Sequence, residues 1–271
     1  MRSRARYRLH GLVAGAAAVI GMLAGIPMVA AAPQRIVSIN LCTDQILLAL
    51  DPGERLAAVS ELARDVELSS EWRRAQGVPV TPASLEHVLG FEPDLVVAGS
   101  FGHTRLLRQV EAMGIDVLRV RAAASFDDIR AAYRAVGTAT GRAARAAALV
   151  GEIDRLLAGP APARGTTALM LSPGMMMHGD AMPGGAVLRH AGFANIAGEA
   201  SYLSLEALAA APPDRVFLAL GDAPAPSRAL RLFAHPALGA LNVSRIPPAP
   251  LMCGSLATAR LARALASDGG H

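Results

Sequence analysis

One pattern occurs twice in this chain: residues 84–99 read SLEHVLGFEPDLVVAG, and residues 204–220 read SLEALAAAPPDRVFLAL. Each copy begins with Ser-Leu-Glu, passes through an apolar turn to Pro-Asp, and ends in a run of apolar residues typical of a buried strand. In each copy the serine can cap a helix, and the glutamate lies in its first turn, where the helix dipole favours a negative charge. The repeat therefore predicts two lobes that share one helix–strand unit.

The two glutamates of the repeat, Glu86 and Glu206, have a local explanation as partners of a helix dipole. That explanation does not account for the same glutamate on the same helix of both lobes. Two exposed acids at matching edges suit docking onto a symmetric, basic partner. We therefore expect both to be docking residues.

Short apolar runs alternate with helical patterns on either side of the repeat, which implies parallel sheets covered by helices. We expect an α/β fold with an N-terminal lobe over residues 33–124 and a C-terminal lobe over residues 164–271. Strands are predicted at residues 35–40, 55–60, 93–99, 115–120, 166–171, 214–220 and 243–246. Helices are predicted at residues 43–50, 83–91, 104–114, 184–192, 204–211, 226–234 and 255–266.

Residues 125–159 contain no proline and no strand pattern, so they predict one long α-helix that joins the lobes. Ser125 is its predicted cap, Gly137 and Gly141 are candidate kink positions, and Gly159 followed by Pro160 ends it. The arginines along it are interpreted as a solvated face rather than as a binding site.

Residues 1–31 have the pattern of a signal peptide. Four arginines precede a run of small and apolar residues from Gly11 to Val29, and Val29-Ala30-Ala31 predicts cleavage near Ala31. The alternative is an uncleaved membrane anchor, since the run approaches the about 20 residues that span a bilayer. We expect an exported, periplasmic protein.

The composition excludes several classes of protein. With 52 % hydrophobic and 18 % charged residues the chain is not disordered, and two cysteines cannot build a disulfide-dense scaffold. Without the four leader arginines, 22 of the 26 basic residues remain against 22 acidic ones, so we expect no nucleic-acid binding. Gly-x-Ser-x-Gly, His-Glu-x-x-His, Walker and dinucleotide-binding motifs are absent from the sequence, so no enzyme is indicated.

Ligands of parallel α/β lobes bind at the carboxyl ends of the strands. This rule selects loops of both lobes as the walls of a cleft, with Phe101 their one aromatic residue. The candidate ligand-binding residues in these loops are Asn40, Cys42, Thr43, Ser60, Arg64, Phe101, His103, Met175, Met177, His178, Asp222, Met252 and Cys253.

The segment Met175–His178 has three interpretations: an apolar wall against a large flat ligand, a soft metal site, or a strand edge packed into the core. Consecutive strand residues point to opposite faces, so all three methionines cannot easily coordinate one ion. His103 and His178 lie in loops expected to face each other, which makes them candidate axial ligands of haem iron or corrinoid cobalt.

Cys42 and Cys253, in loops of opposite lobes, form either a disulfide or a pair of small buried thiols.

In the order and spacing of these segments the chain resembles substrate-binding proteins of the cobalamin and iron–siderophore ABC-transporter class. The resemblance rests on RIVSINLCTDQILLAL, both copies of the repeat, RLLRQVEAMGIDVLRV, the linking helix and VLRHAGFANIAGE. It implies one periplasmic-binding domain over residues 34–271, whose two lobes clasp a metal chelate and are joined by a single rigid helix. The chelate is a corrinoid (cobalamin), a ferric siderophore or haem.

The resemblance also implies the partners and roles. An inner-membrane ABC permease dimer with its ATPase subunits receives the ligand, and its arginines pair with Glu86 and Glu206. The chelate is cargo, and no cofactor is expected. Two alternatives stay open: a soft-metal (copper) binding protein, and a periplasmic α/β enzyme.

Overall fold

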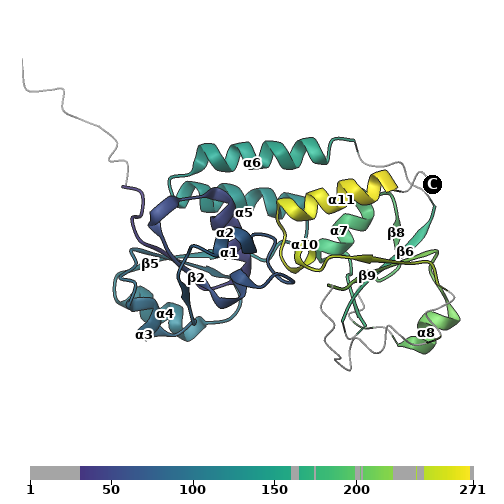
Figure 1. Cartoon of the computed structure of the whole chain (residues 1–271), viewed down its shortest axis with the longest axis horizontal. Helices are drawn as coiled ribbons and strands as arrows, with labels where there is room; N and C mark the ends of the chain where they lie inside the picture. Colours follow the sequence, from purple (N-terminus) through teal and green to yellow (C-terminus); the bar gives the residue numbers. More distant parts are fainter. Residues whose placement is uncertain are drawn as a thin grey trace, which may run out of the picture. The chain divides into compact units, whose positions relative to one another are not determined.

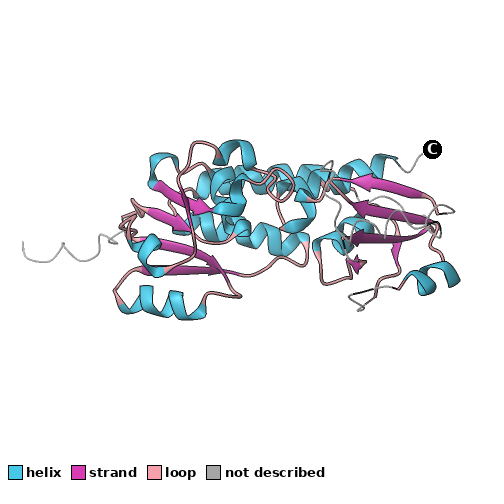
Figure 2. Ribbon diagram, turned by 60° about the horizontal axis from the view of Figure 1, so that its bottom comes forward, coloured by secondary structure: helices cyan, strands magenta, loops and turns pink. Residues whose placement is uncertain are grey.

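The computed structural model describes residues 31–159, 165–173, 175–198, 202, 204–221, 236 and 241–268. From Ala32 onward the chain forms one compact unit. Its strands fall into two sheets, each accompanied by helices (Figures 1 and 2). The predicted leader and the helix predicted at residues 226–234 lie outside the described residues.

The first sheet has five strands in the order β3-β2-β1-β4-β5, and all of its pairs are parallel. Its strands are β1 (Ile36–Ser38), β2 (Leu56–Ser60), β3 (Val80–Thr81), β4 (Leu95–Gly99) and β5 (Asp116–Val120). The helices that accompany it are α1 (Leu41–Leu50), α2 (Trp72–Ala75), α3 (Leu85–Leu89) and α4 (Thr104–Ala112), with short 3-10 turns at Gly53–Arg55 and Glu61–Arg64.

The second sheet has the order β10-β9-β6-β7, and β8 also pairs with β6. Its short strand β7 runs antiparallel to β6, while the other pairs are parallel. The strands are β6 (Thr167–Ser172), β7 (Met176–Met177), β8 (Ala194–Asn195), β9 (Arg215–Ala219) and β10 (Val243–Ile246). The helices are α7 (Pro183–His190), α8 (Leu205–Ala210), α10 (Ala249–Met252) and α11 (Leu256–Asp268). The predicted α/β class with two largely parallel sheets is confirmed.

The sequence repeat corresponds to a repeat in topology. The strand order β2-β1-β4-β5 of the first sheet matches β8-β6-β9-β10 of the second. The Ser-Leu-Glu stretches form α3 and α8, and they lead into the matching strands β4 and β9. The serine side chains cap these helices as predicted: Ser84 accepts a hydrogen bond from the His87 N–H, and Ser204 accepts one from the Ala207 N–H.

The Pro-Asp pair of the repeat has a structural role that sequence reasoning did not identify. The Asp94 carboxylate accepts hydrogen bonds from the N–H groups of Gln34 and Arg35, just before β1. The Asp214 carboxylate accepts bonds from the N–H and hydroxyl of Thr167, the first residue of β6. Each aspartate thus accepts hydrogen bonds from backbone N–H groups at the start of the central strand of its sheet. Without the aspartate, these N–H groups would lack a hydrogen-bond partner.

The prediction of a single helix over residues 125–159 is wrong. The segment forms two helices, α5 (Phe126–Ala139) and α6 (Ala143–Leu156), which lie side by side (Figure 1). Helix α5 ends because the Thr140 hydroxyl bonds the Val136 carbonyl and Gly141 adopts a left-handed φ of 67° that reverses the chain. Arg130 of α5 holds the pair together by donating to Asp154 of α6.

The arginines of this helix pair are not simply a solvated face. Arg142 donates to the carbonyl of Leu50, and Arg145 donates to the carbonyl of Ala49. These carbonyls are at the end of α1, where the helix leaves them without intrahelical partners. The two guanidinium groups therefore cap α1 and also complement the negative end of its dipole.

Helix α11 belongs to both hydrophobic cores. Leu256 and Ala259 in its first turns are buried in the core of the first sheet with side chains of α1, α5 and α6. Leu261, Ala262 and Leu265 are buried in the core of the second sheet with side chains of β6, α7 and β9. Arg260, between these two groups, pairs with Glu152 of α6 at 2.7 Å. Neither sheet has a complete core without this helix.

We predict that Leu256→Ala destabilises both sheets together. Removing this buried side chain costs about 2–5 kcal/mol of unfolding free energy. Urea titrations followed by fluorescence of Trp72, the sole tryptophan, report the first lobe, and far-UV circular dichroism reports the whole chain. Both signals should shift to lower urea and remain coincident. If circular dichroism showed structure remaining at urea concentrations where Trp72 fluorescence has already changed, the shared core would be contradicted.

Candidate functional site

Strands from both sheets deliver their carboxyl ends to one junction. Cys42, in the first turn of α1 after β1, forms a disulfide with Cys253, which follows α10, with a Cα–Cα distance of 5.2 Å. Beside it, the Glu67 carboxylate, after β2, packs directly on Gly221, after β9, where a Cβ would lie only 1.2 Å from Oε2. We call residues 40–44, 60–67, 100–103, 221 and 251–254 the strand-end edge. The structure thus answers the open question about the two cysteines with a disulfide.

Three of the predicted ligand residues form the framework of this edge. Asn40 caps α1 by accepting hydrogen bonds from the N–H groups of Cys42 and Thr43. Thr43 is fully buried and bonds the Ser38 hydroxyl and the Asn40 carbonyl. Ser60 donates its N–H and its hydroxyl to the carboxylate of Asp44. The Asn40 amide oxygen and the Thr43 and Ser60 hydroxyls are thus engaged within the protein, where they shape the edge.

Asp44 is the most unusual titratable group at the edge. It is fully buried in the first turn of α1, and burial raises the pKa of its carboxyl to about 6 against the opposing effect of its hydrogen bonds with Ser38 and Ser60. Asp44 is not among the residues predicted from the sequence, because nothing in the sequence shows that its side chain points inward.

Arg64 and His103 lie at the edge and differ in availability. The Arg64 guanidinium donates to the carbonyls of Ala75 and Val78, at 3.2 and 2.6 Å, so much of its hydrogen-bonding capacity serves the loop after α2. His103 is exposed and precedes α4 with a left-handed φ of 51°. Asp222, the other charged candidate, lies outside the described residues.

Large apolar side chains are exposed at the strand-end edge. Leu62 and Val66 follow β2 and are 49 % and 58 % exposed, Phe101 follows β4 and is 78 % exposed, and Met252 precedes the disulfide and is 46 % exposed. Their gathering in loops at the ends of the strands makes this edge a candidate ligand site. The predicted ligand residues Phe101 and Met252 belong to this group, whereas Leu62 and Val66 were not predicted.

The segment Met175–His178 does not line the edge. Met175 and Met177 are 4 % exposed within the core of the second sheet, and His178 is 2 % exposed. The structure therefore contradicts the apolar-wall interpretation and buries the segment as a strand edge, and the expectation that His103 and His178 face each other as axial ligands is wrong. Burial lowers the pKa of His178 to about 4, and its Nε2 lies 2.7 Å from the Ser172 hydroxyl. A strand of only two residues is too short to show a pattern in the sequence.

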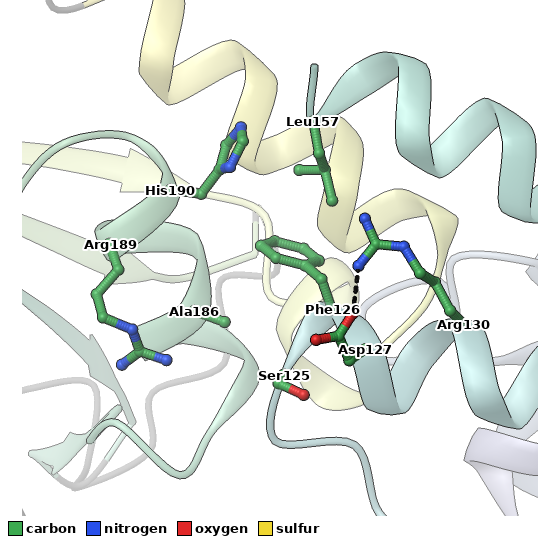
Figure 3. A pocket seen from close by; sticks show the side chains of 8 residues that line it. All are labelled: Ser125, Phe126, Asp127, Arg130, Leu157, Ala186, Arg189 and His190. Atoms are coloured by element: carbon green, nitrogen blue, oxygen red, sulfur yellow. Dashed lines mark hydrogen bonds and ion pairs between the residues drawn. The ribbon is translucent and has the colours of Figure 1, made fainter. Parts of the chain in front are cut away.

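A cavity of about 440 Å³, away from this edge, is lined by the start of α5 and by α7 (Figure 3). Its charged groups already pair with aspartates: Arg130 with Asp127, and Arg189 with Asp180. Phe126 and His190 meet edge to face at 5.8 Å on its wall, and burial lowers the pKa of His190. Sequence reasoning did not identify this cavity, because its two walls come from helices far apart in the chain. Its internal pairing makes it a weaker ligand site than the strand-end edge.

The described residues contain no group of three or more His, Cys, Asp or Glu side chains placed to hold a metal ion. They also contain no helix that is long and apolar enough to cross a membrane.

The two glutamates of the repeat are exposed, Glu86 on α3 and Glu206 on α8.

Comparison with known proteins identifies a family and several similar proteins. A family model described as "Periplasmic binding protein" matches residues 36–242. The cobalamin-binding protein of Halobacterium salinarum is 29 % identical over 127 residues, 46 % of this chain and 34 % of that protein. The vitamin B12-binding protein of Yersinia pseudotuberculosis is 32 % identical over 108 residues, 37 % of this chain and 36 % of that protein. The chain spans about a third of the length of these curated relatives.

Two solved structures share the fold at low sequence identity. The periplasmic heme-binding protein RhuT from Roseiflexus sp. RS-1 is 21 % identical with a TM-score of 0.70, covering 86 % of this chain and 97 % of that one. The periplasmic vitamin B12 binding protein BtuF of Vibrio cholerae is 18 % identical with a TM-score of 0.68, covering 87 % and 96 %.

We predict that Asp44 makes stability fall as pH rises from about 4 to 7. Its carboxyl titrates near 6 when folded and near 3.8 when unfolded, so the folded state binds more protons in this window. Relative to Asp44→Asn, the wild type should lose about 2–3 kcal/mol of unfolding free energy between pH 4 and pH 7, measured by urea titration. Other groups, including His178, are common to both proteins and cancel. A difference that stays constant with pH would contradict the buried carboxyl.

Proposed function

This chain belongs to the periplasmic binding protein family, and on that premise we propose that it captures a metal chelate at the strand-end edge and delivers it to an inner-membrane ABC importer. The observation that carries the proposal is the exposure of Leu62, Val66, Phe101 and Met252 in loops of the strand-end edge, whose two sides the Cys42–Cys253 disulfide joins. These side chains offer apolar area to a large ligand at the ends of strands from both sheets, where α/β proteins bind ligands.

Among corrinoids, ferric siderophores and haem, the charges at the edge favour a corrinoid. Glu61, Asp65 and Glu67 are carboxylates of the loop after β2, while Arg64, the basic residue among them, bonds backbone carbonyls. Catecholate siderophores and haem carry negative charge, which needs free cationic partners. A corrinoid has a rim of neutral amides and apolar methyl groups, which suits apolar side chains flanked by hydrogen-bond acceptors. The curated relatives named for cobalamin and vitamin B12 binding support the same choice.

A small lobe movement on ligand binding is part of the proposal. The disulfide joins the two sheets at the edge itself, and α11 contributes side chains to both cores. Opening the junction widely would break buried contacts of α11. We therefore infer a binding site that is largely formed before the ligand arrives, which lowers the free-energy cost of binding.

Delivery requires a partner, and we assign its contacts to Glu86 and Glu206. These exposed acids lie in the first turns of α3 and α8, which hold equivalent places in the two topologically matching sheets. A permease dimer presents the same basic surface twice, so one glutamate on each lobe fits its symmetry. ATPase subunits drive the permease. The protein itself acts in the periplasm after export, as a binding protein with the chelate as its cargo and no catalytic role.

We predict that a corrinoid stabilises the protein and that Phe101 contributes to binding. Cobalamin or cobinamide at 100 times its dissociation constant should raise the melting temperature by roughly 5–10 °C. Phe101→Ala should weaken binding about tenfold or more without changing the melting temperature of the ligand-free protein, because the ring is 78 % exposed. Met113→Ala, which removes an apolar side chain exposed at the far end of α4, is the matched control and should bind normally. No shift with corrinoids, haem or ferric siderophores would contradict the proposal.

We predict that reversing both docking charges separates binding from transport. The double variant Glu86→Arg with Glu206→Arg should lose at least nine-tenths of ligand uptake in reconstituted transporter vesicles and keep its dissociation constant for the ligand. The control Glu54→Arg with Asp116→Arg makes the same charge change at exposed positions outside α3 and α8. Loss of ligand affinity in the first variant, or equal loss of uptake in both, would refute the docking assignment.

A further inference from the structure

The side chains of residues 175–178 point to two different faces of the second sheet, and one of these faces holds candidate metal ligands. Met175 and Met177 are buried on one face of the second sheet, in the core that includes Leu169 and Leu171. Because strand side chains alternate, Met176 points to the opposite face. Met170 is on that opposite face as well, since it is buried in the other core of this sheet. The alternation that prevents three consecutive methionines from sharing an ion thus brings Met176 and Met170 to one face.

His178 joins the same face. Its N–H bonds the Met170 carbonyl, so it lies opposite Met170 across the β6–β7 pair, as Met176 lies opposite Ser172. Its ring Nε2 is 2.7 Å from the Ser172 hydroxyl, which confirms that the ring points to the Ser172 side. Three soft or borderline metal ligands, two thioethers and an imidazole, therefore occupy neighbouring positions on one face of this strand pair.

The free nitrogen of this imidazole has no partner in the protein. Nδ1 of His178 is buried and makes no hydrogen bond, although the side chain is almost completely enclosed. It faces Gly184 in the first turn of α7: a Cβ at Gly184 would lie 2.6 Å from His178 Nδ1 and 2.6 Å from Met170 Sδ. The nitrogen and the sulfur are therefore no more than 5.2 Å apart, and the absence of a Cβ at Gly184 allows both atoms to lie this close to α7.

We propose that His178 Nδ1, Met170 Sδ and the Met176 thioether form a binding site for a soft monovalent cation, with Cu(I) as the ion that the ligand set fits. Metal–nitrogen and metal–sulfur bonds of about 2.0 and 2.3 Å together reach about 4.3 Å, so a separation of up to 5.2 Å closes with a shift of up to about 1 Å in the flexible Met170 side chain. Cu(I) accepts thioethers and low coordination numbers, whereas harder ions need oxygen ligands.

The surroundings support this choice of ion. Ser172 fixes the orientation of the ring: when Nε2 donates its proton to the hydroxyl, Nδ1 presents a lone pair to the ion. The ring is neutral at pH 7, because burial holds the pKa of His178 near 4. Met176 is half-buried, while Met170 is fully buried, so Met176 is the thioether ligand with access to solvent. The site is separate from the strand-end edge and does not depend on the chelate proposal.

The test is a competition for Cu(I) with bicinchoninate, performed anaerobically on the whole protein with its disulfide intact. The wild type should withdraw one Cu(I) per chain, and X-ray absorption should show nitrogen near 2.0 Å and sulfur near 2.3 Å. Met170→Leu and Met176→Leu preserve apolar volume and should each raise the dissociation constant for Cu(I) at least tenfold. Met175→Leu and Met177→Leu are matched controls on the opposite face and should leave it unchanged.

Three results would overturn the site. They are failure of the wild type to withdraw Cu(I) from the competitor, an absorption spectrum without sulfur neighbours, and equal affinity in the two pairs of methionine variants. His178→Gln should also abolish binding. If that variant does not fold, the methionine series alone decides the question.

Discussion

The packing of α11 into two cores is the constraint on which the rest of the structure depends. Leu256 and Ala259 complete the core of the first sheet, and Leu261, Ala262 and Leu265 complete that of the second. Three residues before this helix, Cys253 is bonded covalently to Cys42 at the start of α1. Noncovalent burial and a covalent bond therefore act on the same short stretch of chain. Together they fix where the carboxyl ends of the two sets of strands meet.

The chemistry of the strand-end edge follows from that junction. Three polar residues near it bond within the protein: Asn40 caps α1, Ser60 bonds the buried Asp44, and Arg64 bonds two backbone carbonyls. What remains for a ligand is mainly the apolar area of Leu62, Val66, Phe101 and Met252 with carboxylates beside it. A large, neutral-rimmed chelate suits such a surface better than an anionic one. The cavity at the start of α5 differs, because its arginines are already paired with aspartates.

The sequence allowed much of the fold to be predicted and rather less of the site. Local signals sufficed for the repeated Ser-capped helices and the main strands, because capping and alternation depend on near neighbours. The roles of Asp94 and Asp214 were missed because their partners lie 59 or 60 and 47 residues away. Gly141 was predicted only as a candidate kink, because a glycine inside a long helical pattern does not show whether the helix bends or ends there. The disulfide and the burial of His178 depend on how distant segments pack, which no local pattern specifies.

The most direct test of the account is hydrogen–deuterium exchange of the whole protein with and without bound cobalamin or cobinamide. Amide exchange slows where a ligand excludes solvent or holds a loop in place. The account predicts slower exchange in residues 40–44, 60–67, 100–103 and 251–254, from both lobes together. Slower exchange confined to the segments around Ser125 and His190, or to one lobe alone, would contradict a chelate site at the junction of the two sheets.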